Sequence, residues 1–132
     1  MPVKLEHIAL NVSDPVAIAA WYKEHLGFEI ARSISTPPYT HFMRESAGTV
    51  MLEFYCNPPD QVPSYSKMHH LLLHLAFVST DPDTDKSRLL AAGAALVVEE
   101  HLPDGSHLVM MRDPWGLAIQ LCKRATPMLH CS

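Results

Sequence analysis

The chain contains two copies of one short motif, and this duplication limits the folds open to it. The segment "HIALNVSDP" at residues 7–15 aligns with "HLAFVSTDP" at residues 74–82, an offset of 67 residues (from 7 to 74). That offset is about half of the 132 residues, so the sequence is a duplication and not a solenoid of many short repeats. A chain of this length supports a single domain with one hydrophobic core. We therefore expect one domain over residues 1–132, made of two similar modules at about 1–57 and 68–124.

Each copy continues with the same order of predicted elements. Asp-Pro suits a helix N-cap and first helical position, and helices are predicted over 16–26 and 83–92, each ended by a glycine. The proline-rich stretch 57–65 is expected to be the linker between the modules. The sequence thus predicts an α+β fold of two paired βαβββ modules, with further strands over 28–34, 40–45, 49–56, 95–100, 107–112 and 117–123.

Composition excludes several classes of function. The net charge is −4 and no cluster of Lys and Arg occurs, which argues against nucleic acid or an anionic membrane surface as a partner. No apolar run reaches the length of a membrane span, and the first residues lack a signal-peptide pattern. Three cysteines, Cys56, Cys122 and Cys131, lack the spacing of a zinc knuckle or a redox pair. We expect reduced thiols in a cytoplasmic protein.

Polar residues recur at matching positions inside apolar, strand-like segments. His7 aligns with His74, whose neighbours from Leu71 to Val78 suggest a buried strand, and Glu53 aligns with Gln120 at the same offset. Side chains alternate between the two faces of a strand. This alternation places each of the four on the face opposite the large apolar residues, which is the face that two curved sheets would enclose together.

Two imidazoles, one carboxylate and one amide oxygen suit a divalent metal ion and leave coordination positions for water or substrate. A buried glutamate also needs a partner, which a metal ion supplies. The alternative is four independent core residues, each satisfied by ordinary hydrogen bonds.

The chain resembles the vicinal oxygen chelate superfamily, which contains glyoxalase I, methylmalonyl-CoA epimerase, extradiol dioxygenases and bleomycin resistance proteins. The resemblance covers about residues 3–124 and lies in "HIALNVSDP", "WYKEHLGF", "MLEFY", "HLAFVSTDP" and "DPWGLAIQL". It implies a cup-shaped mixed sheet around one divalent metal ion (Ni, Co, Zn, Mn or Fe) and a homodimer. Carried over residue by residue, the implied metal ligands are His7, Glu53, His74 and Gln120.

The pattern within the superfamily is closest to glyoxalase I. Glu53 matches that family, and Asn57 matches its glutathione-contacting asparagine. Gln120 stands where the glyoxalase I pattern has glutamate, and Asn11 stands where it favours arginine. The epimerase pattern has the same ligand types with the two halves exchanged.

The resemblance implies chemistry on a small substrate with two adjacent oxygens. A proton leaves the neighbouring carbon and the metal stabilises the resulting enediolate or enolate. Because glutamine cannot take a proton, Glu53 is the predicted catalytic base as well as a ligand. The sequence thus predicts a lyase or isomerase, with substrate-binding residues Asn11, Tyr39, His41, Tyr55, Asn57 and Arg112.

Other interpretations stay open. Arg112 could be a solvated charge, and Tyr39 and His41 could be aromatic packing. The whole protein could instead be a non-catalytic small-molecule or antibiotic-binding resistance protein, or an Fe-dependent dioxygenase. Metal content separates the binding protein from the enzymes.

Overall fold

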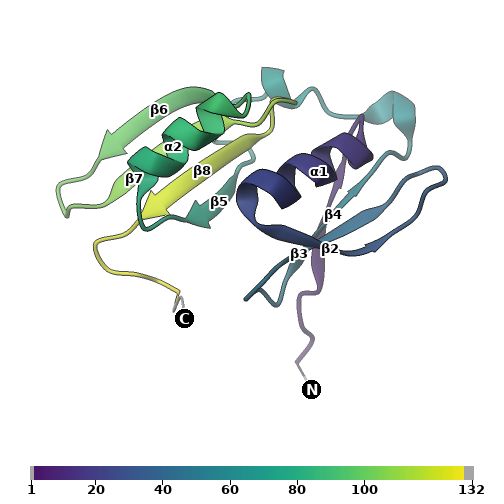
Figure 1. Ribbon diagram of the computed structural model, residues 1–132, viewed down its shortest axis with the longest axis horizontal. Coiled ribbons are helices and arrows are strands. Elements are labelled where there is room, and N and C mark those ends of the chain that lie inside the picture. The colour runs from purple at the N-terminus through teal and green to yellow at the C-terminus, as the bar shows by residue number, and fades with distance from the viewer. Residues whose placement is uncertain (1, 130–132) are drawn as a thin grey trace. The chain divides into compact units, whose positions relative to one another are not determined.

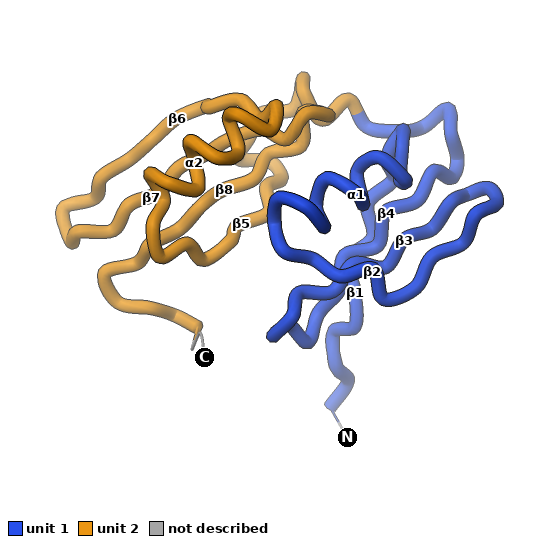
Figure 2. The backbone as a smooth tube through the Cα atoms, in the orientation of Figure 1, with its two compact units in different colours: residues 1–63 blue, residues 64–132 orange. Residues whose placement is uncertain are grey.

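The computed structural model describes residues 2–129 and divides the chain into two compact units, residues 1–63 and 64–132 (Figure 2). Each unit consists of a strand, a helix and three further strands (Figure 1). The predicted α+β fold with paired βαβββ modules is therefore confirmed. The strands and α-helices are β1 (His7–Asn11), α1 (Pro15–Leu26), β2 (Phe28–Ser33), β3 (His41–Glu45) and β4 (Met51–Tyr55), then β5 (Leu75–Val78), α2 (Pro82–Ala91), β6 (Ala95–His101), β7 (His107–Arg112) and β8 (Ala118–Lys123). Two short 3-10 helices, Pro59–Gln61 and Tyr65–Lys67, lie between β4 and β5.

The two sheets have the same topology. The strand orders are β1-β4-β3-β2 and β5-β8-β7-β6, with the first pair of each sheet parallel and the other pairs antiparallel. Ala9 pairs with Glu53 in the first sheet, and Ala76 pairs with Gln120 in the second. Both members of the pair are shifted by the same offset, so the duplication extends from the sequence to the strand register.

Both helices begin as their sequences predict. The Asp14 carboxylate accepts a hydrogen bond from the backbone N–H of Ala17 at 3.1 Å, and Asp81 does the same for Thr84 at 3.2 Å. Helix α1 ends at Leu26 and is capped by Gly27, whose φ of +75° is the left-handed conformation that glycine adopts without a Cβ clash. These caps fix where the chain leaves each opening strand.

Each helix covers one face of its own sheet. Leu52 and Phe54 of β4 are buried on the α1 face, where the Tyr22 and Phe54 ring centroids lie 5.0 Å apart. Leu89 of α2 and Val109 of β7 are fully buried in the second unit. Glu53 and Gln120 are half-buried on the opposite faces, which we call the open faces. The predicted alternation of apolar and polar faces is thus confirmed for β4 and β8, whereas His74 lies outside β5.

The apolar run before β5 differs from the prediction. The strand begins only at Leu75, and residues before it form a turn in which the Leu72 N–H donates to the His69 carbonyl at 3.0 Å. Leu71 and Leu72 are 68% and 74% exposed, so placing them in a buried strand was wrong. A short apolar run alone does not distinguish a strand from an apolar turn.

Cys56 and Cys122 are free thiols, and Cys131 lies outside the described residues. Between residues 2 and 129, no helix combines the length and apolar character needed to cross a membrane.

Candidate metal centre

The first unit brings His7 of β1 and Glu53 of β4 together on its open face. The His7 Nε2 and Glu53 Oε1 atoms are 3.4 Å apart, and their side chains are 33% and 19% exposed. This distance exceeds that of an ordinary N–H···O hydrogen bond and suits two ligands of one ion, each about 2.1 Å from it. The ring of Phe42, which pairs with Glu53, packs edge-on against His7 at 5.3 Å. Sequence reasoning missed Phe42, because finding it needs the β3–β4 register.

The other nitrogen of His7 is held by a carboxylate. Its Nδ1 lies 2.9 Å from Glu6 Oε1. A proton on Nδ1 makes that atom the donor to Glu6 and leaves the Nε2 lone pair directed toward Glu53. Carboxylate partners of this kind orient metal-binding histidines in proteins.

In the second unit, His74 and Gln120 have different hydrogen-bond partners. His74 precedes β5, and its Nδ1 lies 3.1 Å from the His70 carbonyl oxygen, which leaves Nε2 for another partner. The Gln120 Oε1 accepts from the Cys122 thiol at 3.4 Å, and burial raises the pKa of that thiol, which keeps it protonated as a donor. Among the described residues, no hydrogen bond joins His74 to Gln120.

Two of the predicted substrate-binding residues are joined to each other. The Asn57 N–H donates to Asn11 Oδ1 at 2.8 Å, and Asn11 Nδ2 donates to the Pro58 carbonyl at 2.9 Å. Asn11 therefore fixes the chain just after β4. Tyr55 pairs with Asn11 and shares the open face with Glu53. These three residues lie on or just after the two strands that carry the His7–Glu53 pair.

Tyr39 and His41 lie differently. His41 pairs with Phe54 and is 8% exposed, so its side chain lies on the α1 face, opposite Glu53. Its Nδ1 is 2.7 Å from the Tyr39 carbonyl oxygen. Tyr39 is 37% exposed and has a φ of +57°. The structure thus ties these two residues to each other at the start of β3.

Arg112 contacts backbone carbonyls. Its Nη1 donates to Tyr65 at 3.0 Å and to Gly116 at 2.9 Å, and its Nη2 donates to Met68 at 2.7 Å. The guanidinium therefore joins residues 65–68 to the turn between β7 and β8.

The second unit also contains a pocket that the sequence did not predict. Its volume is about 570 Å³, and it lies between the open face of β5 and β8 and the C-terminal segment. Its walls are mainly apolar and include Ala76, Val78, Cys122, Met128 and Leu129. Such a pocket has the size and character of a small-molecule site.

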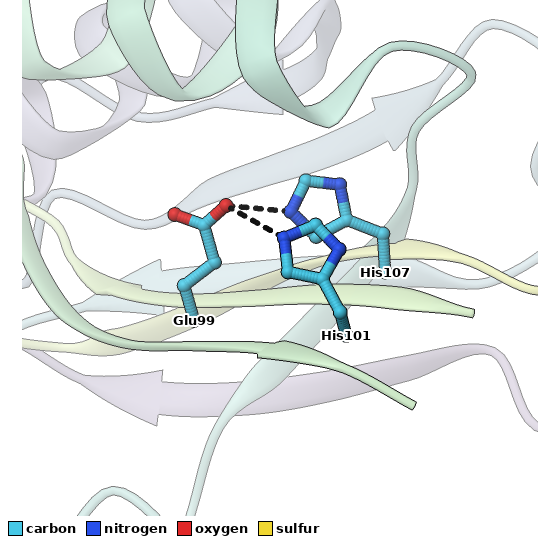
Figure 3. A group of neighbouring side chains, drawn as sticks. All are labelled: Glu99, His101 and His107. Carbon is cyan, nitrogen blue, oxygen red and sulfur yellow. Dashed lines mark hydrogen bonds and ion pairs between the residues drawn. The ribbon is translucent and has the colours of Figure 1, made fainter. Parts of the chain in front are cut away.

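A second group of metal-compatible side chains lies on the β6–β7 hairpin. Glu99, His101 and His107 each offer one ligand atom, and these atoms all lie within 4.8 Å of one another (Figure 3). Sequence reasoning missed this group, although the "PDGS" turn at 103–106 predicts that the two histidines flanking it oppose each other.

The fold agrees with known structures. An antibiotic-binding protein, TnmS3 from Streptomyces sp. CB03234, superposes with a TM-score of 0.70 at 21% identity, covering 91% of this chain and 94% of its own. A glyoxalase family protein from Enterococcus faecalis gives 0.69 at 27% identity, covering 91% and 97%. A lactoylglutathione lyase from Agrobacterium tumefaciens gives 0.64 at 23% identity, covering 92% and 93%.

Comparison with curated proteins found no significant match. The model of the Glyoxalase/Bleomycin resistance protein/Dioxygenase superfamily matches residues 4–121, nearly the whole chain. The strand order, the repeated register and this match lead to one conclusion: the chain belongs to the glyoxalase/bleomycin resistance protein/dioxygenase superfamily.

Proposed function

We propose that the protein is a divalent-metal-dependent lyase or isomerase of the glyoxalase type, acting on a small substrate with two adjacent oxygens. The observation that carries the proposal is the 3.4 Å approach of His7 Nε2 to Glu53 Oε1 on an open sheet face. The donors fit a divalent ion, because the Glu6 contact leaves the His7 Nε2 lone pair available and both side chains are partly buried. His74 and Gln120 are the proposed third and fourth ligands.

Glu53 has two proposed roles. It is a ligand, and on transient release it takes the proton from the substrate carbon next to the two oxygens. A divalent ion held there supplies Lewis-acid stabilisation of the negative charge that develops on those oxygens. Gln120 has no group able to take a proton, and Glu53 is the only carboxylate in the ligand set.

Substrate binding is proposed for residues beside this pair. Asn11, Tyr55 and Asn57 are supported by their positions on or next to β1 and β4. Tyr39, His41 and Arg112 stay predictions. The backbone contacts of Arg112 give it a structural role as well.

The test is metal content together with activity, measured in a chain carrying His101→Ala so that the hairpin cluster does not add to the count. We expect one divalent ion per chain, lost in His7→Ala. Glu53→Gln should abolish glyoxalase or epimerase activity with the metal still bound, whereas the exposed Glu45→Gln should retain activity. Full activity in Glu53→Gln would overturn the role of Glu53 as base. Absence of metal after reconstitution would overturn the enzyme proposal.

A non-catalytic small-molecule-binding protein is the second candidate. It is supported by the apolar pocket of about 570 Å³ and by the likeness in fold to an antibiotic-binding protein. Binding of apolar ligands by metal-free protein, unchanged in Glu53→Gln and weakened in Val78→Asp, would favour this candidate. Iron in the purified protein together with oxygen consumption would favour the dioxygenase alternative.

We also propose a homodimer, supported by the exposed Leu71 and Leu72. Light scattering should give twice the 14.7 kDa mass of one chain. Mixing His7→Ala chains with His74→Ala chains then tests how the ligands are shared. If a site combines one unit from each chain, one of the two sites in every mixed dimer regains all four ligands. If it lies within one chain, none does.

A further inference from the structure

The hairpin cluster is made by strand pairing. His101 at the end of β6 pairs directly with His107 at the start of β7. Glu99 lies two residues before His101 on β6, so its side chain extends from the same face of the strand. Residues from two strands therefore present three potential ligands side by side (Figure 3).

Both imidazoles direct the same nitrogen toward the same carboxylate oxygen. His107 Nε2 is 2.7 Å from Glu99 Oε2, and His101 Nε2 is 3.7 Å from it. The two rings stack with centroids 4.1 Å apart and an interplanar angle of 19°. A hydrogen bond to Glu99 accounts for His107 alone, because 3.7 Å is too long for a hydrogen bond. The His101 imidazole nonetheless directs its Nε2 toward the same oxygen, as it would if the three side chains shared one ion.

The other carboxylate oxygen is already occupied. Lys86 Nζ of α2 is 2.8 Å from Glu99 Oε1, which leaves Oε2 to the histidines. The ammonium cancels the carboxylate charge. The cluster therefore gives little charge attraction to Mg²⁺ or Ca²⁺ and favours ions that prefer imidazole nitrogen.

The cluster is separate from the proposed first centre. Glu99 pairs with Val109, whose side chain lies on the α2 face with His107. The neighbouring residue Met110 pairs with Gln120, which places Gln120 on the opposite face of the same sheet. The two sets of ligands therefore share no residue.

We propose that Glu99, His101 and His107 form a second metal site, selective for Zn²⁺ and similar imidazole-preferring ions. Its place is the α2-covered face of the second sheet. Three protein ligands leave a fourth position for water or an anion. The site is open to solvent on the side of His101, whose side chain is 72% exposed, so an ion can reach it there. Lys86 is a positioning residue that orients the carboxylate.

The experiment uses the full chain carrying His7→Ala and Glu53→Gln, which removes the first centre. Titration with Zn²⁺ alone, followed by calorimetry, should give one ion per chain. Addition of His101→Ala should weaken Zn²⁺ binding at least about tenfold. The matched control is His69→Ala, an exposed histidine of the same unit outside the cluster, which should change nothing. Mg²⁺ should not bind at the same concentrations.

Co²⁺ provides a second measurement, because its visible absorption reports coordination by protein nitrogen. Glu99→Gln and His101→Gln should each lose that absorption while the far-ultraviolet spectrum of the fold is kept. Zn²⁺ binding that is equal in His101→Ala and His69→Ala would overturn the proposal. So would the absence of Zn²⁺ binding in the parent chain, and either result leaves the first centre untouched.

Discussion

At the scale of single residues, Glu99 has more partners than its partial exposure suggests. It bonds Lys86 on one oxygen and His107 on the other, and both contacts lower its pKa. A carboxyl with a lowered pKa in the folded state stabilises the fold above its ordinary pKa and loses that contribution as the pH falls through the lower value.

We therefore expect metal-free Glu99→Gln to be less stable than the parent chain at pH 7. The difference should shrink as the pH falls below about 4, the ordinary range for a glutamate. Urea unfolding in the presence of a chelator measures this. The control is Glu100→Gln, the exposed next residue, whose effect should be small at both pH values. A difference that grows toward acid would contradict the assignment.

Arg112 gives a second prediction at this scale, because it donates to three carbonyls. Arg112→Met should cost about 2–3 kcal/mol of unfolding free energy, since the carbonyls lose a charged donor. Arg112→Lys should recover part of this, because one ammonium cannot reproduce the fork of a guanidinium. The control is Arg44, which forms an exposed ion pair with Glu29. Arg44→Met should cost under about 1 kcal/mol of unfolding free energy. An unchanged unfolding midpoint in Arg112→Met would leave only the substrate-binding prediction for this residue.

The single-residue predictions from sequence succeeded where alternation alone decides them. The offset and the strand parity place Glu53 and Gln120 on the open faces, as the structure has them. Contacts that depend on register could not be predicted. Phe42 against His7 needs the β3–β4 pairing, and the carbonyl contacts of Arg112 need the path of residues 65–68.

At the scale of elements, the turn between β7 and β8 is locked against residues 64–68. Gly116 has a φ of +92°, and a Cβ there would lie 2.7 Å from the backbone nitrogen of Ser66. Gly105, in the β6–β7 turn, has a similar φ of +96° but open space around it. Comparing an alanine substitution at each glycine therefore distinguishes the cost of the backbone conformation from the cost of the steric clash.

Gly105→Ala should cost about 1–2 kcal/mol, from the left-handed conformation alone. Gly116→Ala should cost about 1–3 kcal/mol more, because the turn or the segment at Ser66 must also move. Chemical denaturation of both variants checks this. Equal losses of unfolding free energy in the two variants would show that the segment at Ser66 moves without cost, and the described packing of this turn would then be wrong.

Element boundaries were predictable because their signals are local. Asp-Pro begins both helices, and alternating residues give the strands within about two positions. The exception is the turn before β5, where leucines lie at exposed positions. Hydrophobicity predicts burial only where another element covers the segment, and here no sequence signal tells a covered leucine from an uncovered one.

At the scale of the whole molecule, the two proposed metal centres make overall stability depend on metal. Ions that bind only the folded chain stabilise it by mass action, by about 2.7 kcal/mol at a free concentration one hundred times Kd. Because the centres share no ligand, their contributions should add.

With Zn²⁺ as the only added metal, chelation should lower the melting temperature of the parent chain most. It should lower that of His7→Ala and of His101→Ala by less, and leave the chain with both substitutions unmoved. The loss on chelation in the parent chain should approach the sum of the losses in the two single variants. Equal losses in the parent chain and in His101→Ala would leave the hairpin cluster as an ion pair without metal. Equal losses in the parent chain and in His7→Ala would count in the same way against the first centre.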